Sequence, residues 1–375
     1  MLLRRILLAP FTALYGGVLH LRHALYDAGI LKSTRPPVPT IAIGNLALGG
    51  TGKTPMMELV LRTLEGTGPV ATLSRGYGRR TRTIHEVTPD DTADRSGDEP
   101  LQVKHNLPGV RVFVGADRVK AIAHIQQAVP EVKAVVLDDA LQHRRLDAGL
   151  NILLTTWQRP YCDDALVPAG TLRDLRSRAK AAQVVVVTKC AALPAAAEQQ
   201  RWRERLGLRP GQALFFAGIE YGEPRPIDGG TAPATHRVAP TGTRDENDAT
   251  AILLFTGIAD PAPLATHLRE RFAHVEHIAF ADHRPFTPND LQGLARRFHK
   301  FAPGPKTLIT TEKDAARLRS VIAGSAIDGL PLAVIGMRAV ILNEPERFAD
   351  LIRHHAGPHQ AHRRPSEEGH QRLHP

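Results

Sequence analysis

Cysteine is scarce in this 375-residue chain, where only Cys162 and Cys190 occur, far apart in the sequence. Two such cysteines provide neither a disulfide framework nor the spacing of a zinc site. We interpret them as incidental thiols of a protein from a reducing compartment. Aromatic residues are also few, at 5% of the chain. Aliphatic and alanine side chains must therefore form most of the core.

No hydrophobic run of membrane-spanning length stands at the start of the chain. Residues 6–21 lack Lys, Arg, Asp and Glu, but they are interrupted by Pro10 and are fewer than the roughly 20 apolar residues of a spanning helix. Three interpretations remain open for residues 1–35: a signal peptide, a helix buried in the core, or a helix in the membrane interface with Arg4 and Arg5 at the lipid head groups. We favour the interfacial helix, because residues 20–24 lack a convincing cleavage site.

Negative charge is in the minority. Lys and Arg number 48 against 38 Asp and Glu, which gives a formal net charge of +10. This excess favours an anionic partner, such as nucleic acid, acidic lipid or a phosphorylated substrate, but its sign alone does not choose among them. Hydrophobic residues at 42% and charged residues at 23% are typical of a globular protein with a core.

Short β-rich runs alternate with helical stretches along residues 36–221. Strands are predicted at residues 40–43, 70–73, 112–114, 134–137, 152–155 and 184–188, and helices at 56–64, 118–128 and 172–182. Such alternation predicts an α/β fold, a mostly parallel sheet with helices on both faces.

A second, smaller α/β lobe is predicted at residues 250–350, after a linker rich in Gly, Pro and charge at residues 222–249. Its strands are expected at residues 252–255, 277–280, 307–310 and 332–335, and its helices at 263–272, 288–301 and 313–320. Residues 351–375, rich in His, Arg and Pro, are expected to form a disordered tail rather than a metal site.

A phosphate-binding loop is the strongest local signal. The predicted strand 40–43 is followed by Gly49, Gly50, Thr51, Gly52, Lys53 and Thr54. Backbone N–H groups of such a loop bind phosphate oxygens, helped by the positive end of the following helix. The pattern predicts a P-loop, with Lys53 at the β and γ phosphates and the Thr54 hydroxyl on Mg²⁺. One departure is Ala47, which stands where the standard motif has its first glycine.

A pair of carboxylates suits the metal of such a site. The hydrophobic run 134–137 ends in Asp138 and Asp139, which should lie at the carboxyl edge of the sheet, where ligands bind. We expect one of the two to hold Mg²⁺, and the sequence does not decide which.

The P-loop alone leaves several protein classes open. A GTPase is disfavoured, because the guanine-reading aspartate is missing after Thr188 and Lys189. A switch or partition-type ATPase that binds nucleic acid through the positive charge remains the alternative to an enzyme.

Further blocks, in the same order along the chain, resemble the signature of the tetraacyldisaccharide 4'-kinase family. They are residues 43–46, 49–55, 74–79, 97–100, 138–143, 168–173, 280–287 and 311–314. The chain departs from the family pattern at Ala140-Leu141 in place of Gly-Phe, at Asp174 in place of Glu, and at Arg284 in place of a second His. A further departure is the segment 155–158, which lacks the usual acidic residue. The similarity covers roughly residues 5–350.

The resemblance implies a lipid kinase that moves the γ-phosphate of ATP to the 4'-hydroxyl of an acylated glucosamine disaccharide 1-phosphate. It makes Asp98 the candidate base, acting together with His283 from the second lobe. Closure of the two lobes would then assemble the site. A non-catalytic scaffold is disfavoured, because Lys53, Asp98 and His283 are intact.

Other residues are expected to handle charge and substrate. Arg173 and Arg118 are candidates to offset charge on the transferring phosphoryl group. The remaining substrate candidates are Asn45, Ser74, Arg75, Tyr77 and Arg79.

The expected partners are the lipid substrate and the membrane surface, with no nucleic acid, and a monomer is favoured. The resemblance places the protein at the cytoplasmic face of the inner membrane, with ATP and Mg²⁺ as cofactors.

Overall fold

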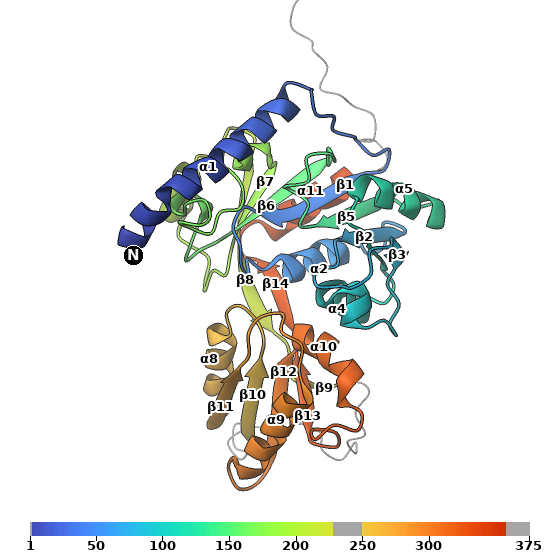
Figure 1. Ribbon diagram of the computed structural model, residues 1–375, viewed down its shortest axis with the longest axis vertical. Helices are drawn as coiled ribbons and strands as arrows, with labels where there is room; N and C mark the ends of the chain where they lie inside the picture. The colour runs from blue at the N-terminus through green and yellow to red at the C-terminus, as the bar shows by residue number, and fades with distance from the viewer. Residues whose placement is uncertain (1, 228–249, 358–375) are drawn as a thin grey trace, which may run out of the picture.

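The computed structural model describes residues 2–227 and 250–357, and it contains two sheets, each flanked by helices (Figure 1). The first sheet has nine strands in the order β14-β8-β7-β6-β1-β5-β2-β4-β3. They are β1 (Thr40–Asn45), β2 (Val70–Ser74), β3 (His85–Glu86), β4 (Arg111–Val114), β5 (Ala134–Asp138), β6 (Leu150–Thr156), β7 (Val184–Thr188), β8 (Ala213–Tyr221) and β14 (Met337–Ile341). All neighbouring pairs are parallel except β14 with β8 and β3 with β4.

Both faces of the first sheet are covered, which explains why its central strands are hydrophobic without alternation. Every residue of β1, β2, β5 and β7 is buried. The helices are α1 (Leu2–Asp27), α2 (Lys53–Thr63), α3 (Ala93–Ser96), α4 (Asp98–Asn106), α5 (Arg118–Ala128), α6 (Ala196–Arg205) and α11 (Pro345–Ala356), with 3₁₀ turns at Tyr161–Asp163 and Arg176–Ala181. Ile41 and Ile43 face the core under α2, whereas Ala42 between them faces the core under α5.

The second sheet has five strands in the order β11-β10-β12-β13-β9. They are β9 (Arg225–Pro226), β10 (Ala251–Thr256), β11 (His274–Ala279), β12 (Lys306–Thr311) and β13 (Leu332–Ile335), packed with α8 (Ala262–Arg271), α9 (Pro288–Lys300) and α10 (Glu312–Ile322). Its core is separate from that of the first sheet and centres on Phe255, Leu308 and Leu318. The α/β architecture with a second smaller lobe, predicted from the sequence, is confirmed.

The chain crosses between the two sheets twice. After β13 it returns to the first sheet, where β14 pairs antiparallel with β8, and Gly222 N donates to Gly336 O at 2.9 Å beside the crossing. Figure 1 shows β8 and β14 side by side between the lobes. The last part of the range 250–350 therefore packs with the first sheet. Residues 351–356, expected in the tail, belong to α11, and the rest of the tail lies outside the described residues.

The helix predicted at residues 172–182 is wrong. Its first half is a loop, and only Arg176–Ala181 forms a 3₁₀ helix. The backbone explains the difference, because Arg173 N donates to Leu46 O at 2.8 Å instead of to a carbonyl of its own turn. This segment is held against the end of β1 and so reaches the P-loop.

Candidate active site

The P-loop leaves the carboxyl end of β1 and enters α2. Gly49 and Gly52 take positive φ angles of 106° and 83°, which side chains with a Cβ rarely adopt. Asn45 Nδ2 donates to Thr51 Oγ1 at 2.8 Å, and Thr188 Oγ1 donates to Thr51 O at 2.8 Å. Lys53 and Thr54 begin α2, as the motif predicts. The loop is thus tied to β1 and β7 on both sides.

Asp138 stands beside this loop because β5 pairs with β1 and Asp138 lies opposite Ile43. Its Oδ2 accepts from Ser74 Oγ at 3.1 Å, whereas its Oδ1 is buried with no hydrogen-bond partner among the described residues. Burial raises the pKa of this carboxyl to about 7. A buried carboxylate oxygen without a donor suits a cation.

Asp139 follows in a left-handed conformation, with φ at 51°, and its carboxylate is already paired. Both of its oxygens accept from Arg173, and Lys53 Nζ lies 3.9 Å from Oδ1. Burial alone would raise the pKa of Asp139, but the Arg173 hydrogen bonds and the Lys53 charge hold it below its usual value. Asn45 Oδ1 also accepts from Arg173, at 2.6 Å. The four side chains form one network at the base of the loop.

Arg118 lies behind this network rather than on its surface. The side chain is only 3% exposed, and its Nη2 donates to Asp138 O at 3.0 Å. The guanidinium therefore supports the backbone of Asp138. This placement does not favour the substrate contact expected from the sequence.

Asp98 and His283 meet across the two lobes. Asp98 opens α4, and its Oδ2 lies 2.9 Å from His283 Nδ1. His283 itself has a positive φ of 58°, a strained conformation for a residue with a Cβ. The hydrogen bond that His283 donates to Asp98 raises the pKa of His283 above its ordinary value. The Asp98 side chain is 7% exposed and that of His283 is 33% exposed, so the imidazole is the more accessible member of the pair.

The second lobe also touches the P-loop. A Cβ added to Gly50 would lie 3.1 Å from the Cβ of Ala259, in the loop after β10. Lys189 Nζ, at the end of β7, lies 3.1 Å from Asp260 Oδ2. The second lobe therefore borders the P-loop through the segment that follows β10.

The loop 74–79 runs beside the dyad. Gly76 and Gly97 pass so closely that a Cβ on Gly97 would lie 3.1 Å from Gly76 Cα. Tyr77 is 71% exposed, and its ring centroid lies 5.5 Å from that of His283. Arg75 is exposed, and Arg79 Nη1 donates to Thr83 O at 2.7 Å. An exposed aromatic ring thus lies next to His283, on a loop that also carries the exposed Arg75.

Comparison with known proteins places these features in one family. The family model of the tetraacyldisaccharide-1-P 4'-kinases, LpxK, matches residues 4–356. The chain belongs to the tetraacyldisaccharide 4'-kinase family.

Relatives with this name support the assignment along most of the chain. The tetraacyldisaccharide 4'-kinase of Bacteroides thetaiotaomicron is 39% identical over 83% of this chain and 82% of its own. That of Flavobacterium johnsoniae is 37% identical over 92% of this chain and 95% of its own. A crystal structure of LpxK from Aquifex aeolicus in complex with ATP matches with a TM-score of 0.69 and 26% identity, over 95% of this chain and 100% of that chain.

In this member of the tetraacyldisaccharide 4'-kinase family, α1 lies against the segment that carries Arg173. Tyr15 Oη donates to Arg173 O at 2.8 Å, and His23 Nε2 lies 2.6 Å from Asp174 Oδ1, with both side chains buried. Arg22 reaches Gln142 O at 2.9 Å, and Gln142 Nε2 in turn donates to Asn45 O at 2.7 Å. The inner face of α1 thus braces the P-loop network. None of the described helices is long and apolar enough to cross a membrane.

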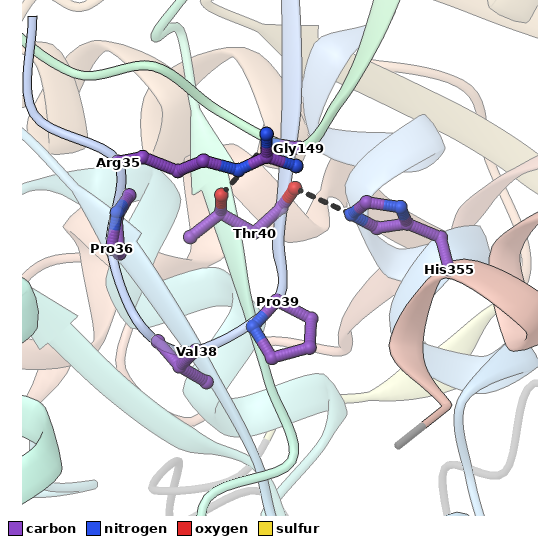
Figure 2. Close-up of a pocket in the computed structure, with 7 residues that line it drawn as sticks. All are labelled: Arg35, Pro36, Val38, Pro39, Thr40, Gly149 and His355. Atoms are coloured by element: carbon purple, nitrogen blue, oxygen red, sulfur yellow. Dashed lines mark hydrogen bonds between the residues drawn. The ribbon is translucent and has the colours of Figure 1, made fainter. Parts of the chain in front are cut away.

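A small pocket shown in Figure 2 lies away from this kinase site. It surrounds Thr40 at the start of β1, where Gly149 N donates to Thr40 Oγ1 and His355 Nε2 lies near Thr40 O, both at 3.1 Å. The P-loop follows the opposite end of the same strand. This pocket therefore belongs to the other edge of the sheet.

Several residues of the site were missed as individual candidates. Lys313 and Arg317 of α10 flank the dyad, and Arg317 Nε lies 4.0 Å from Asp98 Oδ2. Lys313 stands in a block that resembles the family, residues 311–314, which was a usable signal. Tyr15 and His23 left no signal, because they look like ordinary residues of an apolar helix.

Proposed function

We propose that this chain is the ATP-dependent kinase that phosphorylates the 4'-hydroxyl of a tetraacylated glucosamine disaccharide 1-phosphate in lipid A synthesis. Membership of the family over residues 4–356 supports the reaction. The single observation that carries the site is the 2.9 Å contact between Asp98 Oδ2 of the first lobe and His283 Nδ1 of the second.

Nucleotide binding falls to the P-loop. Phosphoryl transfer requires alignment and charge neutralisation around the triphosphate. The backbone of residues 49–52 and the side chain of Lys53 would hold the phosphates of ATP. Arg173, fixed by Asp139 and Asn45, adds a positive charge at the same place.

Mg²⁺ would be held by Thr54 and Asp138. The unpartnered Oδ1 of Asp138 fits a cation, whereas both oxygens of Asp139 are engaged by Arg173. Among the residues that the structure describes there is no cluster of three or more His, Cys, Asp or Glu side chains for a metal. Few protein ligands are expected here, because Mg²⁺ in nucleotide sites is bound through one or two side chains, water and the phosphates. Bound there, Mg²⁺ would neutralise charge on the phosphates.

For the base that accepts the proton of the sugar hydroxyl, we place His283 ahead of Asp98, the candidate that the family resemblance implies. Burial would raise the pKa of Asp98, but the hydrogen bond from His283 and the nearby Lys313 hold it below its usual value, which makes this carboxylate a weak base. His283 has the raised pKa and the greater exposure. In this arrangement Asp98 orients the imidazole and stabilises its protonated form.

The sugar and its phosphate would lie on the loop 74–79. Arg75 and Arg79 suit an anionic head group, and the exposed ring of Tyr77 suits the face of a sugar. Ser74 is buried and bonded to Asp138, so its part is to hold that carboxylate.

The outer face of α1 would lie in the cytoplasmic surface of the inner membrane. Leu7, Phe11, Leu14, Val18 and Leu21 are each more than half exposed. Their spacing places them on one side of the helix, away from the buried Leu19 and His23. A helix with one apolar exposed face is typical of interfacial binding.

Transfer of radiolabelled phosphate from ATP to a disaccharide-1-phosphate lipid in detergent micelles tests the proposal. Wild type should phosphorylate the lipid, whereas Lys53→Ala and His283→Ala should lose at least about a hundredfold in rate. His274→Ala, an exposed histidine of the same lobe, is the matched control and should keep full activity. No transfer by wild type, together with steeply salt-dependent DNA binding, would instead favour a partition-type ATPase.

A further inference from the structure

Lys313 holds the second nitrogen of the His283 ring. Its Nζ, projecting from the first turn of α10, lies 3.0 Å from His283 Nε2 and 3.1 Å from Asp282 Oδ1. Glu99 Oε1 is 3.7 Å away, and the Lys313 side chain is 15% exposed. The lysine is therefore fixed among three partners at the junction of the lobes.

This contact selects one tautomer of His283. A lysine ammonium has donors and no acceptor, so Nε2 must be the unprotonated nitrogen. The ring proton then sits on Nδ1 and is donated to Asp98 Oδ2 at 2.9 Å. The nitrogen that a base needs is thus the one that faces Lys313.

The charges around the imidazole oppose one another. Asp98 of α4 favours the imidazolium most, through its hydrogen bond, and Asp282 adds to it, whereas burial and Lys313 disfavour it. The pair is also bordered by Glu99 of α4, Arg317 of α10 and the ring of Tyr77 in the loop 74–79. Arg284, next in the chain, pairs with Asp290 instead. Loss of the Lys313 cation would therefore favour the imidazolium, and with it a proton on Nε2, more strongly.

We propose that Lys313 is a positioning residue for the phosphoryl transfer, which keeps Nε2 of His283 unprotonated and aimed at the space that the sugar hydroxyl enters. The inference rests on the proposed function. When the hydroxyl arrives it replaces the ammonium at Nε2, and Lys313 remains bound to Asp282 and Glu99.

The transfer step then balances. The hydroxyl proton moves to Nε2, and the resulting imidazolium is paired with Asp98. The hydroxyl oxygen forms its bond to the γ-phosphorus of ATP as the bond from that phosphorus to the bridging oxygen breaks, and ADP leaves with the electron pair.

The pH dependence of kcat/KM tests this role with Lys313→Met and Lys313→Arg. In Lys313→Met the opposing charge is lost, the pKa of His283 rises, and the acid limb should move upward by about one pH unit, with a roughly tenfold loss of kcat/KM below the limb. Lys313→Arg keeps the positive charge, so its acid limb should lie within roughly a few tenths of a pH unit of the wild-type limb. Lys306→Met is the matched control, because Lys306 binds the carbonyls of residues 299, 301 and 302 and lies over the ring of Phe298 in the same lobe.

An unmoved acid limb in Lys313→Met would overturn the inference, and so would a raised KM for ATP as the only effect. Nitrogen NMR of wild type with labelled histidine gives a second readout, which does not depend on the folding of a variant. A proton on Nε2 of His283 in the resting enzyme would also contradict the inference. Full activity of His283→Ala is a different outcome, because it would remove the proposed function itself.

Discussion

At the scale of single residues, the surroundings of Asp98 and His283 decide which of the two holds the proton more tightly. The carboxylate is buried at the first position of α4, where Glu99 N also donates to its Oδ1 at 2.9 Å. Backbone donors and the positive helix end stabilise its charge. The imidazole that it contacts is correspondingly the stronger base.

Replacement of Asp98 by Asn should therefore lower both the pKa of His283 and the rate. The loss of the carboxylate destabilises the imidazolium, so the acid limb of kcat/KM moves to lower pH, while kcat falls by about a hundredfold because the base is weaker and less well oriented. Steady-state rates of phosphate transfer between about pH 5 and pH 9, a range that includes the ordinary pKa of histidine, measure both effects. An acid limb that moves upward would show that Asp98 is not paired with His283 in the working enzyme.

A second titratable group lies away from the chemistry. Glu58 of α2 is 3% exposed, and it accepts from Asn106 Nδ2 at 2.9 Å and from Gln102 Nε2 at 3.2 Å. Asn106 also donates to Glu312 at 2.8 Å, so the cluster joins α2, α4 and α10. Burial raises the pKa of Glu58 to about 7. Its proton is then held more tightly in the folded chain than in the unfolded one.

Glu58→Gln should stabilise the protein in a pH-dependent way. Because the folded-state pKa is raised, the contribution of the Glu58 proton to the free energy of unfolding is fully present below the unfolded pKa near 4.5 and is lost as pH rises through about 7. The free energy of unfolding of Glu58→Gln should exceed that of wild type at pH 8 by on the order of 2 kcal/mol, and the two should nearly agree below the ordinary glutamate pKa. Urea unfolding at both pH values measures the difference, and a difference independent of pH would contradict the assignment.

At the scale of elements, α1 has two faces with different tasks. Serine in place of Leu7, Phe11 and Leu14 should weaken binding to anionic lipid vesicles by at least about tenfold, because each large apolar side chain contributes on the order of 1 kcal/mol or more. The same variant should keep its rate on substrate in detergent micelles. Vesicle co-sedimentation and the transfer assay measure the two properties.

Tyr15→Phe is the matched control, because Tyr15 lies where α1 contacts the segment that carries Arg173. It removes the hydrogen bond to Arg173 O without changing the outer face, so it should leave vesicle binding intact and lower kcat. Equal vesicle binding by the triple serine variant and wild type would exclude the outer face as the membrane contact.

Elements with clear periodicity were predictable from sequence. The helix at residues 118–128 and the strand at 332–335 have the predicted bounds, and the P-loop follows its strand as expected. The segment 172–182 was not predictable, because its backbone bonds to Leu46 far away in the sequence. Nor could the sequence show that Arg118 is buried or that Lys313 reaches His283, since both depend on how separate elements pack. The dyad itself came from the family resemblance and not from local pattern.

At the scale of the whole molecule, the residues of the proposed site are divided between lobes. Lys53, Asp98 and Asp138 come from the first sheet and its helices, and His283 and Lys313 come from the second lobe. The cluster around Asn106 and the contact of Gly50 with Ala259 join the lobes at two further places. Each lobe by itself lacks part of the site.

The pairing of β8 with β14 has a consequence for how this protein is built. Tyr221 and Met337 lie opposite each other in adjacent antiparallel strands, so the second lobe is an insertion at the tip of what would otherwise be a β-hairpin. Replacing residues 223–335 by a tight turn such as Asn-Gly should give a shorter protein that folds, because β14 and α11 keep their places.

Such a hairpin version should bind ATP with similar affinity by calorimetry and transfer no phosphate to lipid. A simple truncation after residue 222 should instead be unstable, since it removes an edge strand and the buried Phe348 and Ile352. Loss of nucleotide binding in the hairpin version would mean that the insertion also shapes the P-loop. The inserted segment would then make two contributions to the proposed site, His283 and the shape of the P-loop, although the first lobe folds without it.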